Sequence, residues 1–177
     1  NEGGTWIVGA SYLEIDNDYL GYNLDPLMIM RISLSHEYFH GIQWGYEENL
    51  GVNSYFYEMT STWFEDILIP DGNDYLDGWV DELLNNPTED FDITMTGGYE
   101  LALFGHYLSS FIDPKGVETA KNSTIIREIW ERYRDHTTSA FSAVKYVLED
   151  STKGYGTSFI EAWVDFITRN LYNGSFE

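Results

Sequence analysis

The stretch DPLMIMRISLSHEYFH, residues 25–40, decides the fold of this chain. Asp25 is a helix-capping residue and Pro26 suits the first helical position, so a helix should begin here and run to about residue 44. Residues 27–34 are almost wholly apolar, which is typical of a buried helix. Polar side chains within such a helix are costly unless a partner satisfies them.

The polar end of this helix has the pattern His-Glu-x-x-His, formed by His36, Glu37 and His40. Histidines four positions apart lie on one helical face, so both imidazoles can reach one metal ion. The glutamate beside the first histidine projects toward the same site, where it can accept a proton from an attacking water molecule. We therefore interpret the motif as a zinc-peptidase signature.

A third metal ligand must come from elsewhere, and the chain has no cysteine to provide it. Catalytic zinc typically takes three protein ligands and a water molecule. The stretch SYFYEMTSTWFED, residues 54–66, predicts a second helix that Asn53 or Ser54 can cap. One face of this helix carries four polar side chains, by their spacing: Glu58, Ser61, Thr62 and Glu65. Spacing alone does not choose between the two glutamates as the ligand.

These paired motifs resemble the gluzincin metallopeptidases, which carry His-Glu-x-x-His and a ligand glutamate about one helix later. Glu58 lies 18 positions after His40. The strings over residues 36–46 and 58–66 are closer still to a bacterial family of secreted gluzincins. The resemblance implies that His36, His40 and Glu58 bind one catalytic Zn²⁺ and that Glu37 is the general base. It also implies a secreted, extracellular protein.

The resemblance fails at one position. Many gluzincins have an acidic residue four positions after the ligand glutamate, where it hydrogen-bonds a ligand histidine, but Thr62 stands there in this chain. We expect Glu65 or Asp66 to take that role, and Thr62 to lie with them among the residues that support the ligands. Gluzincins also commonly use a Tyr or His to stabilise the oxyanion on the substrate carbonyl. Tyr99, at the start of a predicted helix, is our candidate, and a core aromatic is the alternative interpretation.

Other candidates are weaker. His106 and Tyr107, on later turns of the same helix, are second choices for the oxyanion. The segment DGND, residues 71–74, offers carboxylates to Ca²⁺, but it lacks the spacing of an EF-hand loop, and a plain turn is favoured. Glu14, on a predicted N-terminal strand, is a candidate to meet a substrate's amine, although an exposed strand glutamate is the simpler interpretation.

The charge of the chain bears on its partners. The formal net charge is −21, from nine Lys and Arg against 30 Asp and Glu. Contacts to phosphate need basic side chains, so this composition argues against nucleic acid and anionic membranes. An acidic surface attracts cationic substrates, although a role in solubility explains it as well. No apolar run is long enough for a membrane-spanning helix, so we expect no membrane insertion.

The start of the chain suggests an excerpt. It begins with Asn1 and shows no signal peptide, so we expect a processed chain or a piece of a longer protein. Zincins usually have more sheet before the metal-binding helix, which favours a longer parent protein. The absence of cysteine excludes disulfides and thiol catalysis.

Turn signals divide the chain into short elements. Residues 5–15 are rich in β-forming side chains and predict a strand, and residues 86–96 form either an irregular segment or a short strand. We expect helices over residues 26–44, 54–68, 75–85, 98–112, 123–134, 139–149 and 158–172. The predicted fold is mainly α with a small N-terminal β-sheet, an α+β, zincin-like catalytic domain that spans residues 1–177 as one unit.

The sequence thus predicts a zinc-dependent peptidase acting on peptides or proteins. Two other classes stay open. One is a zinc-containing pseudoenzyme or adhesion module without peptidase activity, and the other is a structural helical domain whose motif is coincidental. Zinc content separates the last class from the others, and chelator-sensitive turnover separates the first from the second. Endo- or exopeptidase action and oligomeric state stay open.

Overall fold

The structure of the chain, a computed structural model, describes residues 12–19, 21–22, 24–47, 53–76, 78–86, 90–92, 97–136 and 139–172. Every regular element in these ranges is helical. The α-helices are α1 (Pro26–Gln43), α2 (Ser54–Leu68), α3 (Trp79–Asn85), α4 (Ala102–Tyr107), α5 (Ile125–His136), α6 (Ala140–Glu149) and α7 (Phe159–Tyr172). Between them lie the 3-10 turns η2 (Asp74–Leu76), η3 (Tyr99–Leu101) and η5 (Ala120–Asn122) and the π-helical turn η4 (Leu108–Ile112).

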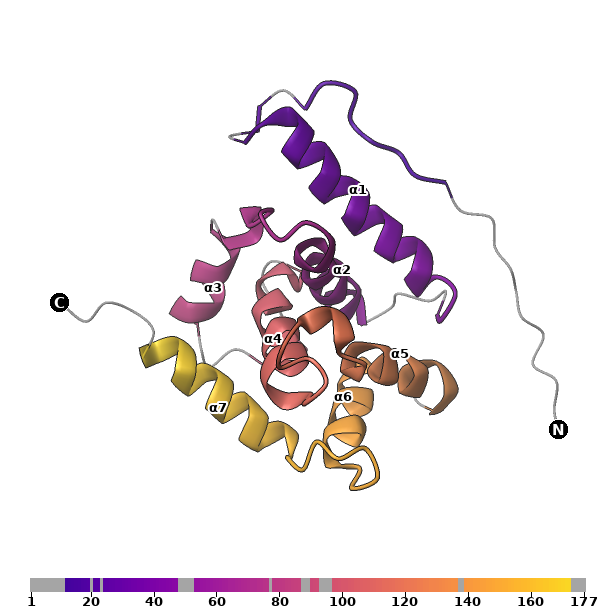
Figure 1. Cartoon of the computed structure of the whole chain (residues 1–177), viewed down its shortest axis with the longest axis vertical. Coiled ribbons are helices and arrows are strands. Elements are labelled where there is room, and N and C mark those ends of the chain that lie inside the picture. The colour runs from indigo at the N-terminus through magenta and orange to yellow at the C-terminus, as the bar shows by residue number, and fades with distance from the viewer. Residues whose placement is uncertain are drawn as a thin grey trace, which may run out of the picture.

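Helix α1 lies along one edge of the molecule and packs on α2, which lies inside (Figure 1). The predicted start of α1 is confirmed, since the Asp25 side chain accepts a hydrogen bond from the backbone N–H of Met28. The apolar residues of α1 lie on all sides of the helix. Those on the side away from α2 are therefore exposed, and Leu27 and Tyr38 are more than half exposed. On α2 the small Ser61 is fully buried against α1, where a larger side chain would hold the two helices apart.

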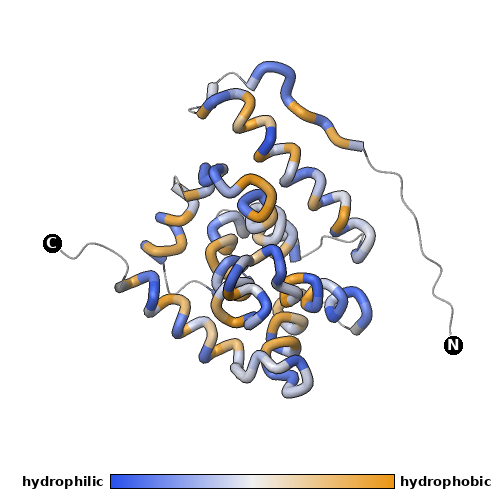
Figure 2. Tube along the Cα trace, viewed as in Figure 1, coloured by the Kyte–Doolittle hydropathy of each residue, from blue (hydrophilic) through white to orange (hydrophobic). Residues whose placement is uncertain are grey.

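Aromatic side chains fill the core and hold α2 in place. Trp130 of α5 lies 4.8 Å from Phe56 and 4.9 Å from Tyr57 of α2, between ring centroids. Gly105 allows α4 to approach α2 closely, because a Cβ atom there would lie 3.1 Å from Trp63. In Figure 2, α7 alternates hydrophobic and hydrophilic residues along its length, as expected of a helix that covers a core with one side.

A buried aspartate fixes the start of α5. Asp113 is fully buried, and its Oδ2 accepts hydrogen bonds from Ser123 Oγ at 2.8 Å and from the N–H of Thr124 at 2.7 Å. Its Oδ1 accepts from the N–H of Lys115 at 2.9 Å. Burial raises the pKa of Asp113, but these hydrogen bonds outweigh burial and lower it below its usual value. Asp113 therefore holds both Ser123 and the first backbone N–H groups of the α5 region in place.

The prediction of a small N-terminal β-sheet is wrong for the part of the chain that the structure describes. Of the predicted strand at 5–15, residues 5–11 lie outside the described ranges, and residues 12–15 are irregular and exposed. Residues 15–19 lie near the first turns of α1. A strand needs a neighbouring strand to pair its backbone N–H and C=O groups, and no described segment supplies one. The described residues of 86–96, namely 86 and 90–92, form no strand either.

The predicted helices are confirmed. The boundaries of α1, α2, α6 and α7 agree with the predicted ones to within one residue. The predicted helix 75–85 is divided into η2 and α3. No helix among the described residues combines the length and the apolar character that crossing a membrane demands.

Candidate metal centre

The structure brings His36, His40 and Glu58 together between α1 and α2. Glu58 Oε2 lies 3.1 Å from His36 Nε2 and 3.6 Å from His40 Nε2. His36 is buried, whereas His40 and Glu58 are partly exposed. One carboxylate oxygen therefore faces both imidazoles at the side of the centre that solvent can reach.

The two distances from Glu58 are close to the donor spacing around one zinc ion. Zinc binds nitrogen and oxygen ligands at about 2.0–2.2 Å in tetrahedral sites, so two of its donor atoms lie about 3.3–3.6 Å apart. The separations of 3.1 and 3.6 Å from Glu58 are close to that range. A carboxylate oxygen of Glu37 and one nitrogen of each histidine lie within 4.8 Å of one another. Two imidazoles and a carboxylate leave a fourth position open, as in catalytic zinc sites.

Glu65 contacts the other nitrogen of His36. Glu65 Oε1 lies 2.5 Å from His36 Nδ1, and its side chain is buried. Burial lowers the pKa of His36, but hydrogen bonds and charge from Glu58 and Glu65 raise it to about 9. Burial likewise raises the pKa of Glu58, and its hydrogen bonds to His36 and His40 lower it well below the usual range. Burial raises the pKa of Glu65 to about 7, although its hydrogen bond to His36 opposes this shift. Without a metal, His36 is therefore protonated beside the ionised Glu58, and a metal ion would replace the proton on Nε2.

A glutamine that the sequence analysis did not identify contacts the other nitrogen of His40. Gln43 is 1 % exposed, and its Oε1 lies 2.7 Å from His40 Nδ1. Its Nε2 donates to the carbonyl oxygen of Tyr57 on α2 at 2.9 Å. The sequence does contain one indication of this contact. Gln43 lies three residues after His40 and seven after His36, so helical spacing places it on the same face of α1 as both histidines.

Tyr99 lies beside His36 and Glu58. Its ring stacks on His36 at 5.8 Å and its hydroxyl hydrogen-bonds to Glu58, while the Trp79 ring lies 4.4 Å from it. The backbone at Gly98 has φ +114°, and a Cβ atom there would lie 2.1 Å from the carbonyl oxygen of Tyr55. Burial and the nearby Glu58 carboxylate raise the pKa of Tyr99, so its hydroxyl stays a hydrogen-bond donor.

The other two predicted supporting residues do not contact the histidines of the motif. Asp66 accepts a hydrogen bond from Tyr75 at 2.9 Å, and its Oδ2 lies 3.3 Å from His106 Nε2. Thr62 is fully buried, and its Oγ1 has no hydrogen-bond partner among the described residues. Of the three residues predicted to support the metal ligands, only Glu65 contacts one of them directly.

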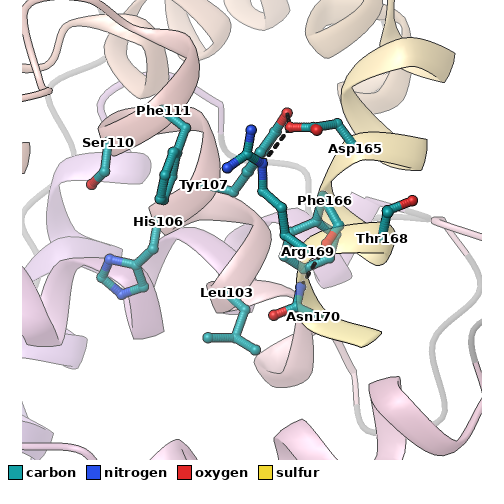
Figure 3. A pocket seen from close by; sticks show the side chains of 10 residues that line it. All are labelled: Leu103, His106, Tyr107, Ser110, Phe111, Asp165, Phe166, Thr168, Arg169 and Asn170. Carbon is teal, nitrogen blue, oxygen red and sulfur yellow. Dashed lines mark hydrogen bonds and ion pairs between the residues drawn. The ribbon is translucent and has the colours of Figure 1, made fainter. Parts of the chain in front are cut away.

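His106 and Tyr107 line a separate pocket of about 600 Å³ between α4, η4 and α7 (Figure 3). Tyr107 donates a hydrogen bond to Asp165 at 2.7 Å, and Asp165 pairs with Arg169 at 2.6 Å. In Figure 3 the imidazole of His106 lies at the other end of the pocket from this ion pair. None of the predicted metal ligands lines the pocket.

The weaker candidates lie in irregular segments. Asp71 lies in a turn closed by the hydrogen bond from the N–H of Gly72 to the carbonyl oxygen of Ile69 at 2.8 Å, and Asp74 begins η2. Gly72 packs against Ile32 of α1. Glu14 is exposed in the irregular segment before α1. Within the described part of the chain, His36, Glu37 and His40 are the group of potential ligand side chains whose donor atoms all lie within 4.8 Å of one another.

Comparisons with known protein families, with curated proteins and with solved structures give no match for this chain.

Proposed function

We propose that the chain is a zinc-dependent peptidase whose zinc is held by His36, His40 and Glu58. The observation that carries this proposal is the placement of one Glu58 oxygen 3.1 and 3.6 Å from the two Nε2 atoms. Two helices supply the donors, and buried partners hold the other nitrogen of each ring. Such support from a carboxylate or carbonyl oxygen is a recurrent feature of histidines that bind zinc.

The surrounding side chains suit peptide hydrolysis. Bound zinc supplies a Lewis acid that polarises the scissile carbonyl and the attacking water. Glu37 follows His36 on α1, and its carboxylate accepts the proton from that water and delivers it to the leaving amine. The Tyr99 hydroxyl donates a hydrogen bond to the carbonyl oxygen as negative charge develops there.

Zinc content and the Glu37→Gln variant test the proposal together. We expect about one zinc per chain after zinc-replete preparation, and peptide cleavage that a chelator abolishes. Glu37→Gln keeps the shape of the side chain but removes the base, so it should keep zinc and lower turnover by about 10²–10⁴-fold. The matched control is Glu149→Gln, an exposed position on α6, which should leave both properties unchanged.

Three results would redirect the proposal. Metal content near zero would leave the motif as a structural feature of a helical domain. Zinc binding without cleavage of any peptide in a broad library would favour a zinc-containing binding module. Equal turnover of Glu37→Gln and the unsubstituted protein would remove Glu37 from its role.

A further inference from the structure

The orientation of the buried Gln43 amide follows from its partners. One end of the amide lies 2.9 Å from the carbonyl oxygen of Tyr57, and a backbone carbonyl can only accept a hydrogen bond. The NH₂ group must therefore face Tyr57, and the Oε1 atom must face His40. Thr60 agrees with this orientation, since its hydroxyl donates to the carbonyl oxygen of Phe56 at 2.8 Å and accepts from Gln43 Nε2 at 2.9 Å.

The orientation of Gln43 in turn determines the state of His40. The Oε1 atom can only accept, so His40 Nδ1, at 2.7 Å, must carry a hydrogen and donate it. In the neutral ring the lone pair is then on Nε2, the nitrogen that faces Glu58 and would bind the metal. Without a metal, a hydrogen on Nε2 could instead donate to Glu58, so Gln43 and Glu58 compete for the tautomer of His40. Ser61 Oγ also lies 3.1 Å from Nδ1, but a hydroxyl donates or accepts and so favours neither tautomer. Gln43 alone of these two residues selects one.

We propose that Gln43 is a positioning residue that holds His40 as the Nδ1–H tautomer, with the Nε2 lone pair directed to the metal. This inference rests on the proposed function and assigns a role to a residue outside the His-Glu-x-x-His motif. It also separates the two histidines. The carboxyl group of Glu65 contacts His36, whereas the amide of Gln43 contacts His40. A bound zinc would thus have one imidazole supported by a carboxyl group and one supported by an amide.

The tautomer can be measured without metal and without any substitution. Two-bond ¹⁵N–¹H correlations of the histidine rings, recorded on the metal-free chain while the His40 ring is neutral, identify the nitrogen that bears the hydrogen. We expect the Nδ1–H form for His40, with a hydrogen-bonded Hδ1 resonance. The Nε2–H form in the unsubstituted protein would overturn the proposal.

The zinc affinities of matched variants show whether Gln43 positions His40 or only packs α1 against α2. Gln43→Met keeps the approximate volume but removes the acceptor, and should weaken zinc binding about 10–100-fold. Thr60→Val removes a partner of Gln43 Nε2 on α2 and leaves the bond to His40 in place. Thr60→Val should lower the melting temperature by about as much as Gln43→Met does, but it should leave the zinc affinity unchanged. Ser61→Ala should leave both the affinity and the His40 tautomer unchanged.

Each pattern of results has one meaning. Loss of zinc affinity in Gln43→Met alone, together with loss of the Nδ1–H preference, supports the proposal. Equal losses in Gln43→Met and Thr60→Val would mean that Gln43 only joins α1 to α2, and unchanged affinity in both would mean that it has no role at the metal. If the unsubstituted chain binds no zinc, the proposed function fails, while the tautomer measurement still decides the role of Gln43.

Discussion

At the scale of single residues, Glu58 and Glu65 make the clearest contrast. Both lie on α2 and contact His36, but Glu58 faces Nε2 and Glu65 faces Nδ1. Glu58→Ala should therefore weaken zinc binding sharply and abolish turnover. Glu65→Ala should keep zinc bound and lower turnover about 10–100-fold, because it removes support for a ligand rather than the ligand. Competition with a chelator measures the affinities, and equal losses in the two variants would contradict the assignment.

Tyr99 provides a second test at this scale. Tyr99→Phe removes the hydroxyl near Glu58 and keeps the ring that stacks on His36. A donor that acts mainly on developing charge affects the transition state, so we expect kcat to fall about 10–1,000-fold with little change in KM. Tyr107→Phe, whose hydroxyl contacts Asp165, is the control and should keep the original kcat. If kcat and KM of Tyr99→Phe were unchanged, Tyr99 would be a packing residue without a role in stabilising the oxyanion.

The residues of the motif were predictable because they are local. His36 and His40 share a helical face by their spacing, whereas the choice of Glu58 over Glu65 came from the resemblance to the gluzincins. Gln43 was not found, since glutamine has no strong preference for a metal site and its role depends on the Tyr57 carbonyl across the helix pair. Thr62 and Asp66 were predicted to support the ligands, but the direction of their side chains depends on packing that spacing does not specify.

At the scale of elements, the start of α5 depends on Asp113. Asp113→Asn keeps an acceptor but loses the charge, and we expect it to lower the free energy of unfolding by about 1–3 kcal/mol at pH 7. Because folding lowers the pKa of Asp113, its stabilisation is complete above the unfolded pKa of about 3.9 and is lost as pH falls through the folded pKa. Denaturant unfolding at several pH values should show the difference between the two proteins narrowing in acid. If the difference in the free energy of unfolding stayed constant with pH, the charge of Asp113 would not be the source of its stabilisation.

Local sequence signals predicted the helices well, but they did not predict contacts between residues that are far apart in the sequence. Asp25 followed by Pro26 fixed the start of α1, and Ser158 forms a reciprocal cap with Glu161 at the start of α7. The cap from Asp113 reaches α5 across a loop of about ten residues, which no local pattern reports. The predicted sheet failed for a related reason. Side-chain preference for a strand is local, but the pairing that makes a sheet is not.

At the scale of the whole molecule, the negative charge is concentrated in one part of the chain. Residues 1–114 contain one Arg and 21 Asp or Glu, whereas residues 115–177 contain eight Lys or Arg and nine Asp or Glu. All the predicted metal ligands lie in the first part. The segment that carries Asp71 and Asp81 adjoins the metal centre, since Gly72 packs on α1 and Trp79 packs on Tyr99.

This distribution predicts faster turnover of cationic peptides. We expect kcat/KM for a Lys-rich peptide to exceed that of its Glu-rich counterpart about tenfold or more at low salt, and the advantage to shrink at high salt. Replacing Asp71 and Asp81 by Asn should reduce the advantage. The control replaces Glu118 and Glu149 by Gln, which removes the same charge from the second part. Equal effects of the two pairs would show that only total charge matters.

The position of α1 at the edge of the molecule has a consequence for how long the protein survives. This helix is held along one side, and its outer side leaves Leu27 and Tyr38 open to solvent. A metal ion bound by His36, His40 and Glu58 would act as a cross-link between α1 and α2, as a disulfide would for a loop of similar length. If the chain is the zinc peptidase proposed above, losing the ion would let α1 detach and expose its backbone to cleavage by a neighbouring copy. The metal would then set the lifetime of the protein as well as its activity, and a population short of zinc would digest its own inactive members first.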